Sequence, residues 1–352
     1  MRVGIIGAGA IGEKHAAACQ AVGVEVGWVI DRDEARAAKL ADAHHATAKA
    51  DPEHLWEDGS VGAVVVGVPN CFHKPLAIEA MQAGKDVLLE KPMAFTAQEC
   101  DEILSVAEST GRLLQIGYAH RFTAVGAGAK QVIDTGALGE IYHAKAHLHL
   151  RRGVPGLGGW FTNKQMAGGG ALIDLGVHLI DLALYLAGEP KPVAVSGKAY
   201  NKFGGRMKDY VYESMWAGPP NYNGVFDVDD HATAMIMLEG GATIDLQVAW
   251  ACNLPSPSAP DSVVALLGDK GGVSFELFGD HLLMRSETAR LNSETRLALP
   301  AADPMASQMK DFVKAVESRE HGVGASPVEG RRVQAIVDAI YKSSETNRPV
   351  EF

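Results

Sequence analysis

The chain has 352 residues, of which 47% are hydrophobic and 21% are charged, proportions typical of a soluble globular protein. Its 32 lysines and arginines stand against 43 aspartates and glutamates, which gives a formal net charge of −11. This acidic balance argues against nucleic acid or an anionic membrane as the main partner, because both require a basic surface. A chain of this length is expected to fold into two domains.

Four scattered cysteines, none of them in a C-x-x-C pair, indicate reduced thiols in a cytoplasmic protein. The first apolar run, residues 3–6, starts almost at once, without the charged and apolar regions that mark a secretory signal. No apolar run reaches about 18 residues, so we expect no membrane-spanning helix. The sequence therefore predicts a protein of the cytoplasm.

A glycine-rich turn follows this first strand, with the sequence Gly-Ala-Gly-Ala-Ile-Gly at residues 7–12. Gly7 permits a tight turn, Gly9 leaves room for a pyrophosphate against the backbone, and Gly12 lets the helix at 13–21 pack closely on the strand. The amino end of that helix offers its amides to the phosphates. We therefore expect a dinucleotide cofactor here, bound by Gly7, Gly9, Ala10, Ile11 and Gly12.

An acidic residue at the end of the second predicted strand, residues 24–30, supports this interpretation. Asp31 lies 31 − 12 = 19 residues beyond Gly12, where a ribose-binding acid is expected. Its carboxylate would accept hydrogen bonds from the ribose hydroxyls and repel a 2′-phosphate, which favours NAD over NADP. Arg32 follows directly and is able to hold that extra phosphate, so NADP stays open as the alternative.

Strand and helix patterns alternate through the first part of the chain, with further buried strands at 63–68, 86–89 and 113–117. This order predicts an α/β protein that begins with a doubly wound parallel sheet, a Rossmann domain at residues 1–122. Ligands bind at the carboxyl ends of the strands in such sheets. The residues that follow two of these strands are therefore candidate cofactor ligands: Pro69, Asn70, His73, Glu90 and Lys91.

Lys91 is a candidate for chemistry as well as for binding. Pro92 restrains the loop after it, and Glu90 supplies a possible partner for its ammonium group. A loop lysine that is merely exposed is the alternative. Its position at the carboxyl end of a strand favours function.

The pattern then changes and predicts a second α/β domain at residues 123–352, built on an open, mostly antiparallel sheet. A strand at 140–150 alternates apolar residues with four polar ones, His143, Lys145, His147 and His149. We interpret these as the polar face of a half-buried strand and expect no metal, because no carboxylate or cysteine completes a ligand set in this stretch. An open sheet must cover its exposed face, so we expect a homodimer or homotetramer.

The predicted helix at 171–186 follows three glycines, residues 168–170, and carries a polar stripe on an apolar background. Asp174, His178 and Asp181 occupy positions i, i+4 and i+7, so they lie on one face. Burying this helix would bury the stripe, and buried ionisable groups need partners or a cavity. We interpret Asp174 and His178 as catalytic, with a structural His–Asp pair as the alternative, and Asp181 as structural.

Two loop segments complete the candidate site. The glycine-rich segment 151–170 mixes aromatic and hydrogen-bonding side chains, as expected for a loop that binds a sugar and covers a cofactor. Residues 201–227 form a turn-rich, aromatic excursion that covers either a site or a subunit contact. From the first segment we expect a cofactor contact by Trp160 and substrate contacts by Arg152, Phe161 and Asn163.

Four motifs in this order resemble the glucose–fructose oxidoreductase and inositol dehydrogenase family over the whole chain. They are the glycine turn, Glu90-Lys91-Pro92, Gly-Tyr-Ala-His-Arg-Phe at 117–122, and Gly168-Gly169-Gly170-x-x-x-Asp174-x-Gly176-x-His178. The segments Arg-Arg-Gly-Val-Pro-Gly at 151–156, Phe-Thr-Asn-Lys at 161–164 and Tyr-Lys-Ser-Ser-Glu-Thr at 341–346 are similar to the bacterial glucoside 3-dehydrogenase branch. That second resemblance implies a pyranoside substrate.

The family resemblance also implies roles for individual residues. His178 would take the hydroxyl proton as general base, Lys91 would hold the substrate oxygen, and Asp174 would orient the reacting pair. The 117–122 junction adds three expected substrate contacts, Tyr118, His120 and Arg121. His120 departs from the family pattern, because family members often carry other polar residues at this position.

Taken together, the resemblance implies an NAD-dependent dehydrogenase that oxidises a secondary alcohol of a sugar, with C3 of a glucoside as the first candidate. The alternatives are an inositol or anhydrosugar dehydrogenase, a keto-sugar reductase, and an NAD-dependent glycosidase in which transient C3 oxidation assists bond cleavage. The expected partner is thus a small sugar or cyclic polyol. A cofactor-sensing protein without turnover is a further class, and the presence of Lys91, Asp174 and His178 argues against it.

Overall fold

The computed structural model describes residues 1–213, 215–255 and 261–352, which fold into two compact units. Unit 1 comprises Met1–Ala119 and Asp303–Gln334, and unit 2 comprises His120–Ala302 and Ala335–Phe352. The first division falls close to the boundary expected at residue 122. The return of Asp303–Gln334 to unit 1 differs from the expectation that all later residues belong to the second domain.

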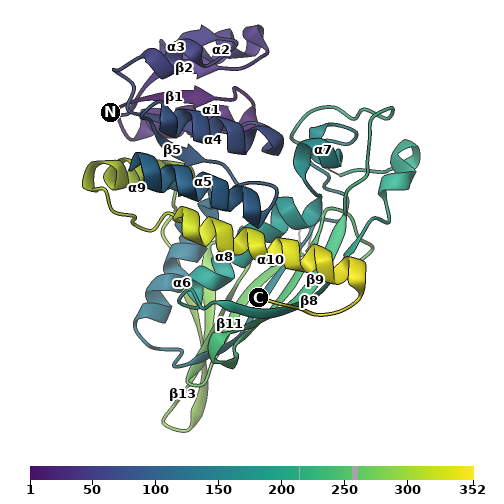
Figure 1. Ribbon diagram of the computed structural model, residues 1–352. Coiled ribbons are helices and arrows are strands. Elements are labelled where there is room, and N and C mark those ends of the chain that lie inside the picture. Colours follow the sequence, from purple (N-terminus) through teal and green to yellow (C-terminus); the bar gives the residue numbers. More distant parts are fainter. Residues whose placement is uncertain (214, 256–260) are drawn as a thin grey trace. The chain divides into compact units, whose positions relative to one another are not determined.

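Unit 1, which contains the labelled strands β1, β2 and β5 in Figure 1, is a doubly wound Rossmann domain. Its parallel sheet has six strands in the order β3-β2-β1-β4-β5-β6. The strand order reverses between β1 and β4, which is where such sheets bind ligands. The central strands are almost completely buried, as expected for strands covered on both faces. The strands are β1 (Arg2–Ile6), β2 (Glu25–Ile30), β3 (Thr47–Lys49), β4 (Ala63–Val66), β5 (Asp86–Leu89) and β6 (Leu114–Ile116).

Two helices of unit 1 have clear local start signals. Asp33 and Thr96 cap α2 and α5 through their side chains, and Gly111 ends α5 in the left-handed conformation. The five helices between the strands are α1 (Ala10–Ala21), α2 (Glu34–His44), α3 (Glu53–Glu57), α4 (His73–Gln82) and α5 (Ala97–Thr110).

Helix α9 (Pro304–Ser318) explains why the end of the chain returns to unit 1. It packs against α1, and its buried residues Met309, Phe312 and Ala315 join the same core as the first strands. The sequence shows an amphipathic helix here, but an apolar stripe does not reveal which sheet it will cover.

Unit 2 is an α/β unit on a nine-stranded sheet, in the order β14-β13-β12-β11-β7-β10-β9-β8-β15. Its strands pair antiparallel except for β7 and β10, so the expected open, mostly antiparallel sheet is confirmed. The last hairpin, β13 and β14, was not expected from the sequence. The strands are β7 (Ile141–His149), β8 (Pro192–Tyr200), β9 (His231–Leu238), β10 (Thr243–Ala249), β11 (Asp261–Gly268), β12 (Gly271–Phe275), β13 (His281–Thr288), β14 (Leu291–Ala298) and β15 (Val350–Glu351).

Helices cover one face of this sheet. The unit contains α6 (Ala124–Asp134), α7 (Lys164–Ala167), α8 (Val177–Leu186) and the later part of α10 (Pro327–Thr346). Helix α8 packs against β7, β10 and β11. Among the described residues, Lys164–Leu186 is the one helical stretch long and apolar enough to cross a membrane by composition, and most of it is buried as a core segment.

The other face of the sheet is open. On β7, Ala144, Ala146 and Leu148 are buried, while His143 and Lys145 on the opposite side are half-exposed. The predicted polar outer face is therefore confirmed along most of β7, whereas His149 at the end of the strand is itself buried. No group of residues suited to a metal ion occurs among those described.

Candidate active site

The glycine turn of unit 1 has the geometry that a dinucleotide requires. Gly7 has a φ of 101°, and a Cβ at Gly12 would collide with the carbonyl of Gly7, so both positions need glycine for the fold itself. A Cβ at Gly9, by contrast, would meet no atom within 4 Å. Gly9 therefore leaves open space beside the amino end of α1, where a pyrophosphate can approach the backbone.

Asp31 lies next to this turn, at the end of β2. Its Oδ2 accepts a hydrogen bond from the backbone of Ala8 at 2.8 Å, and its Oδ1 accepts one from Asp33 at 2.9 Å. Arg32 extends in another direction, with its guanidinium 4.5 Å from the centre of the Phe72 ring. The carboxylate is thus fixed beside the turn, while the following arginine stacks on a residue that follows β4.

The segment after β4 contains Pro69, Asn70 and His73, three predicted cofactor ligands. Asn70 begins a short 3-10 helix, Asn70–Phe72, and is 8% exposed. His73 is buried, and its ring nitrogens lie 2.7 Å from the Pro92 carbonyl and 2.9 Å from the Val68 carbonyl. These backbone contacts favour a role for His73 in bracing the loops, in place of the direct cofactor contact that we expected.

Glu90 and Lys91 follow β5, as predicted. Lys91 is partly exposed, and the Lys91–Pro92 peptide bond is cis. Both carboxylate oxygens of Glu90 face protein groups, since Oε1 lies 2.7 Å from His15 Nε2 and Oε2 lies 3.3 Å from the backbone nitrogen of Lys91. Glu90 thus supports the loop, and His15 is a participant that the sequence motifs did not single out.

In unit 2, the three glycines explain how the helix with Asp174 and His178 is held. Gly168 ends α7 in the left-handed conformation, with a φ of 81°. A Cβ at Gly169 would collide with the hydroxyl of Tyr341, and one at Gly170 would collide with the backbone of Asp229. The absence of side chains at Gly169 and Gly170 therefore leaves room for Tyr341 and Asp229, which anchor the start of the helix.

Asp229 is the centre of that anchor. Its carboxylate accepts hydrogen bonds from the backbone of Gly170 and Leu172, both at 2.8 Å, and from the Tyr341 hydroxyl at 2.7 Å. Asp229 therefore acts as a cap at the amino end of the helix. Neither Asp229 nor Tyr341 was assigned a role from the sequence.

The helix does not start as a regular α-helix. Leu172–Gly176 form a π-helical turn that continues into α8, and Asp174 lies inside this turn. Such turns are rare and frequently occur at functional sites. His178 follows in the first turn of α8 and is partly exposed, although its neighbours along the helix are buried.

Two contacts define the surroundings of these residues. Asp174 is 8% exposed, and its Oδ2 accepts a hydrogen bond from the indole nitrogen of Trp250 at 2.9 Å. The His178 ring lies edge-on to the His120 ring, with their centres 4.8 Å apart. Unit 2 therefore brings Asp174 and His178 together with the predicted substrate ligand His120. Trp250 also belongs to this region, although the sequence did not single it out.

Replacing Trp250 with phenylalanine is expected to lower kcat about tenfold, because a hydrogen bond to a charged group is lost while most of the ring remains. Trp28→Phe is a matched control, since Trp28 donates a similar bond to Asp58 in unit 1, at 2.8 Å. Steady-state kinetics and melting temperatures of both variants give the comparison. Equal losses of kcat in the two would mean that Trp250 acts only through stability.

Arg121 and Asp181 form a buried ion pair. The guanidinium donates to both carboxylate oxygens, at 2.6 and 2.9 Å, and the side chains are 2% and 1% exposed. Arg121 also lies over the ring of Tyr185. The structural role expected for Asp181 is confirmed, and this pairing argues against the substrate contact expected for Arg121.

Arg121→Leu is expected to lower the free energy of unfolding by about 3–5 kcal/mol, because it leaves the carboxylate of Asp181 buried without its partner. The double variant Arg121→Leu/Asp181→Leu should recover most of this loss, since the charge of Asp181 is then gone and Glu189, which Arg121 also contacts at 3.1 Å, is 27% exposed to water. Urea denaturation of both proteins measures the difference. A single variant as stable as the wild type would contradict the assignment.

The remaining predicted substrate residues have structural contacts as well. Arg152 donates to the carbonyl of Cys252 and to Asn253, both at 2.6 Å, and its guanidinium lies over the Phe203 ring. Asn163 caps α7 by accepting a bond from Gln165. Arg152 therefore braces the backbone after β10, which argues against the substrate contact expected for it. Tyr118 is buried in unit 1.

The aromatic residues of the 151–170 segment pack under the 201–227 excursion. Trp160 and Phe161 stack with ring centres 3.7 Å apart, and Trp216 meets Phe161 edge-on at 5.3 Å. Backbone hydrogen bonds join the two segments from Glu213 to Asp227. The excursion thus covers the glycine-rich segment, apart from residue 214, which lies outside the described part.

Comparisons with known proteins add independent findings. Residues 1–118 match the oxidoreductase family with an NAD-binding Rossmann fold, and residues 127–274 match the GFO/IDH/MocA C-terminal domain. The D-glucoside 3-dehydrogenase of Escherichia coli is 32% identical over 100% of this chain and 97% of its own length. Inositol 2-dehydrogenase 2 of Saccharopolyspora erythraea is 33% identical over 54% of both chains.

Solved structures share the fold. A levoglucosan dehydrogenase in complex with NADH and levoglucosan superimposes with a TM-score of 0.87 at 23% identity, covering 100% of this chain and 99% of the other. GenD2 from gentamicin A biosynthesis, in complex with NAD, gives a TM-score of 0.79 at 25% identity over 100% and 96% of the two chains. The two-unit architecture is therefore one that binds nicotinamide cofactors in other proteins.

Proposed function

Because the chain belongs to the GFO/IDH/MocA family of NAD-binding oxidoreductases, we propose that it oxidises a secondary alcohol of a sugar with NAD, at C3 of a glucoside in the first instance. The observation that carries this proposal is the similarity to a D-glucoside 3-dehydrogenase along the whole chain. The open space at Gly9 and the fixed carboxylate of Asp31 fit the cofactor. Nicotinamide supplies the hydride acceptor when it is bound.

The proposed roles of three side chains follow from their chemistry. His178 accepts the hydroxyl proton as general base, since an imidazole gains and loses protons near neutral pH. The ammonium group of Lys91 donates to the reacting oxygen and stabilises the negative charge that develops there. Asp174, held by Trp250, orients the hydroxyl and the base. The alcohol loses a hydride from carbon and a proton from oxygen, which leaves the ketone.

Asp31 is the proposed selector of the cofactor. Asp31→Ser is expected to raise the NADP-to-NAD ratio of kcat/KM by about tenfold or more, because the carboxylate that repels a 2′-phosphate is gone. Glu34→Gln removes an exposed charge nearby, in the first turn of α2, and should leave the ratio unchanged. Steady-state kinetics with both cofactors measure the ratio. If Asp31→Ser keeps the wild-type ratio, another group selects the cofactor.

The test of the function is NADH formation over a panel of glucosides, free sugars, anhydrosugars and inositols, followed by identification of the oxidised carbon. Activity confined to pyranosides with oxidation at C3 supports the proposal. Activity only with inositols or levoglucosan moves the protein to the functions named for other relatives. Release of free sugar without net NADH indicates the glycosidase alternative, and NADH consumption with keto-sugars alone indicates a reductase.

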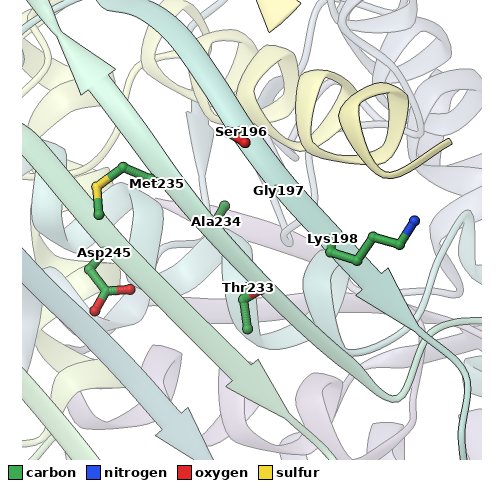
Figure 2. A pocket seen from close by; sticks show the side chains of 7 residues that line it. All are labelled: Ser196, Gly197, Lys198, Thr233, Ala234, Met235 and Asp245. Carbon is green, nitrogen blue, oxygen red and sulfur yellow. The ribbon is translucent and has the colours of Figure 1, made fainter. Parts of the chain in front are cut away.

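We further propose that the open face of the nine-stranded sheet meets a second copy of the chain in a homodimer or homotetramer. Figure 2 shows a hollow on this face, lined by strands β8, β9 and β10. It lies on the face opposite to α8, so it is distinct from the Asp174–His178 region. On this face His147 of β7 lies 2.8 Å from Asp245 of β10, Lys145 is the register partner of Asp245, and Met235 and Met237 are exposed.

A two-fold partner would cover the exposed methionines, which otherwise leave apolar surface in water. Light scattering at micromolar concentration tests this proposal, and a monomer would refute it. A cytoplasmic location is proposed with it, because the four cysteines form no disulfide among the described residues. Cell fractionation tests the location.

A further inference from the structure

A buried pair in unit 1 connects two segments that the proposed chemistry uses separately. His15 lies in α1, the helix that begins at the glycine turn, and Glu90 follows β5 directly before Lys91. Nε2 of His15 is 2.7 Å from Oε1 of Glu90, and the two side chains are 1% and 10% exposed. Because a carboxylate only accepts hydrogen bonds, His15 is the donor.

The other oxygen of Glu90 reaches the loop itself. Oε2 accepts a hydrogen bond from the backbone nitrogen of Lys91 at 3.3 Å, so one carboxylate joins α1 to the residue that carries the ammonium group. The Glu90 side chain also lies against Gly117, where a Cβ would come within 3.1 Å of the carboxyl carbon. The carboxylate is therefore confined on several sides.

The close approach of α1 to the sheet makes this pairing possible. Only glycine at position 12 avoids the carbonyl of Gly7 and lets the helix start so near the strand. His15 lies three positions later, on the same side of the helix, and is fully buried. The residues that shape the cofactor turn thus also bring His15 to Glu90.

We propose that His15 and Glu90 are positioning residues that fix the Lys91 loop relative to the glycine turn. The pair keeps the ammonium group in one geometry with respect to the cofactor site. This proposal rests on the proposed function, in which Lys91 contacts the reacting oxygen. Displacements of about 1 Å in such a group are enough to lower turnover by about 100-fold.

The electrostatics give the pair a distinct pH signature. Burial by itself would raise the pKa of Glu90, but the hydrogen bond and charge of His15, with Lys91 and His73 nearby, outweigh burial and lower that pKa. Glu90 is therefore ionised at neutral pH. Without His15 the burial remains and the partner is lost, so the pKa of Glu90 should rise. Protonation of Glu90 would then add a second loss of activity on the acid side of the pH profile, beside the protonation of His178 that sets the acid limb of the wild type.

The experiment compares three full-length variants with the wild type. His15→Leu removes the donor and keeps an apolar side chain, whereas His15→Gln keeps an N–H donor. Cys19→Ala, at a buried position of the same helix, controls for damage to helix packing. For each protein we would measure kcat and KM for an alcohol that the wild type oxidises, the pH profile of kcat/KM, and the NADH dissociation constant by fluorescence.

We expect His15→Leu to lower kcat by about 10- to 100-fold and to add a second ionisation to the acid side of the kcat/KM profile, with NADH affinity within about threefold. His15→Gln should recover most of the turnover. Cys19→Ala should keep the wild-type kcat and the wild-type pH profile of kcat/KM. A His15→Leu enzyme with wild-type kcat and pH profile would overturn the proposal. So would a loss that His15→Gln does not relieve, since that indicates packing alone.

Failure of the proposed function is distinguishable from failure of the pair. A wild-type protein that binds NADH but oxidises no alcohol in the panel refutes the function. The pair is then tested without turnover by carbon-13 NMR of the glutamate carboxyls, with Glu90 assigned from Glu90→Gln. A rise in the pKa of Glu90 in His15→Leu supports the pair, and an unchanged pKa refutes it.

Discussion

Lys91→Ala is expected to lower kcat by about 10²- to 10³-fold while the dissociation constant for NADH changes little. Lys91 lies at the carboxyl end of β5, partly exposed, on a loop whose backbone is held by Glu90. In the proposed mechanism its ammonium group opposes charge that develops on the substrate oxygen only as the proton leaves. Its removal should therefore act on turnover more than on cofactor binding. Steady-state kinetics and a fluorescence titration with NADH separate the two effects.

Lys74→Ala is the matched control for this variant. Lys74 also lies in unit 1, near the start of α4, and forms ion pairs with Glu99 and Glu102 at 3.4 and 3.1 Å. Such partly exposed pairs contribute little to stability, so the control should retain wild-type turnover. Near wild-type turnover in Lys91→Ala would remove this lysine from the mechanism.

The parts of the site that the sequence predicted are those set by neighbouring residues. The turn at Gly7, Gly9 and Gly12, the acid at position 31 and the loop after β5 each depend on a strand, a turn and a few adjacent side chains. Their spacing reflects the local geometry of a strand-turn-helix unit. The doubly wound sheet of unit 1 and the open sheet of unit 2 followed from hydrophobic periodicity in the same way.

The parts that it did not predict depend on contacts between distant segments. His15 and Glu90 are separated by 75 positions, and Trp250 and Asp174 by 76. No periodicity links such residues, because tertiary packing brings them together. A general signal was present for Asp181, since a charge on a buried helix needs a partner, but the identity of that partner as Arg121 required the fold.

The π-helical turn at Leu172–Gly176 was not predicted either, for a different reason. Hydrophobic periodicity distinguishes a helix from a strand but does not resolve one extra residue within a turn. The turn alters the path of the backbone at Asp174, directly before His178. The predicted helix was therefore right in extent, while the local geometry at its functional end came only from the structure.

His178→Gln is expected to lower kcat/KM by about 10²- to 10⁴-fold, the range over which general bases contribute. Glutamine keeps a hydrogen-bonding side chain but does not accept the proton of the alcohol. In the wild type the imidazole must be neutral to act as base, so activity should fall on the acid side of the pH profile. That limb should disappear from the small residual activity of the variant.

His120→Gln tests whether the loss belongs to His178 or to the histidine pair. The two rings are 4.8 Å apart, so either could be the proton acceptor by proximity alone. His178 lies on the helix anchored by Asp229 and beside Asp174, whereas His120 precedes α6 in the junction to unit 2. We therefore expect His120→Gln to raise KM and to keep the acid limb of kcat/KM. The reverse result, with the limb lost in His120→Gln and kept in His178→Gln, would transfer the role of general base to His120.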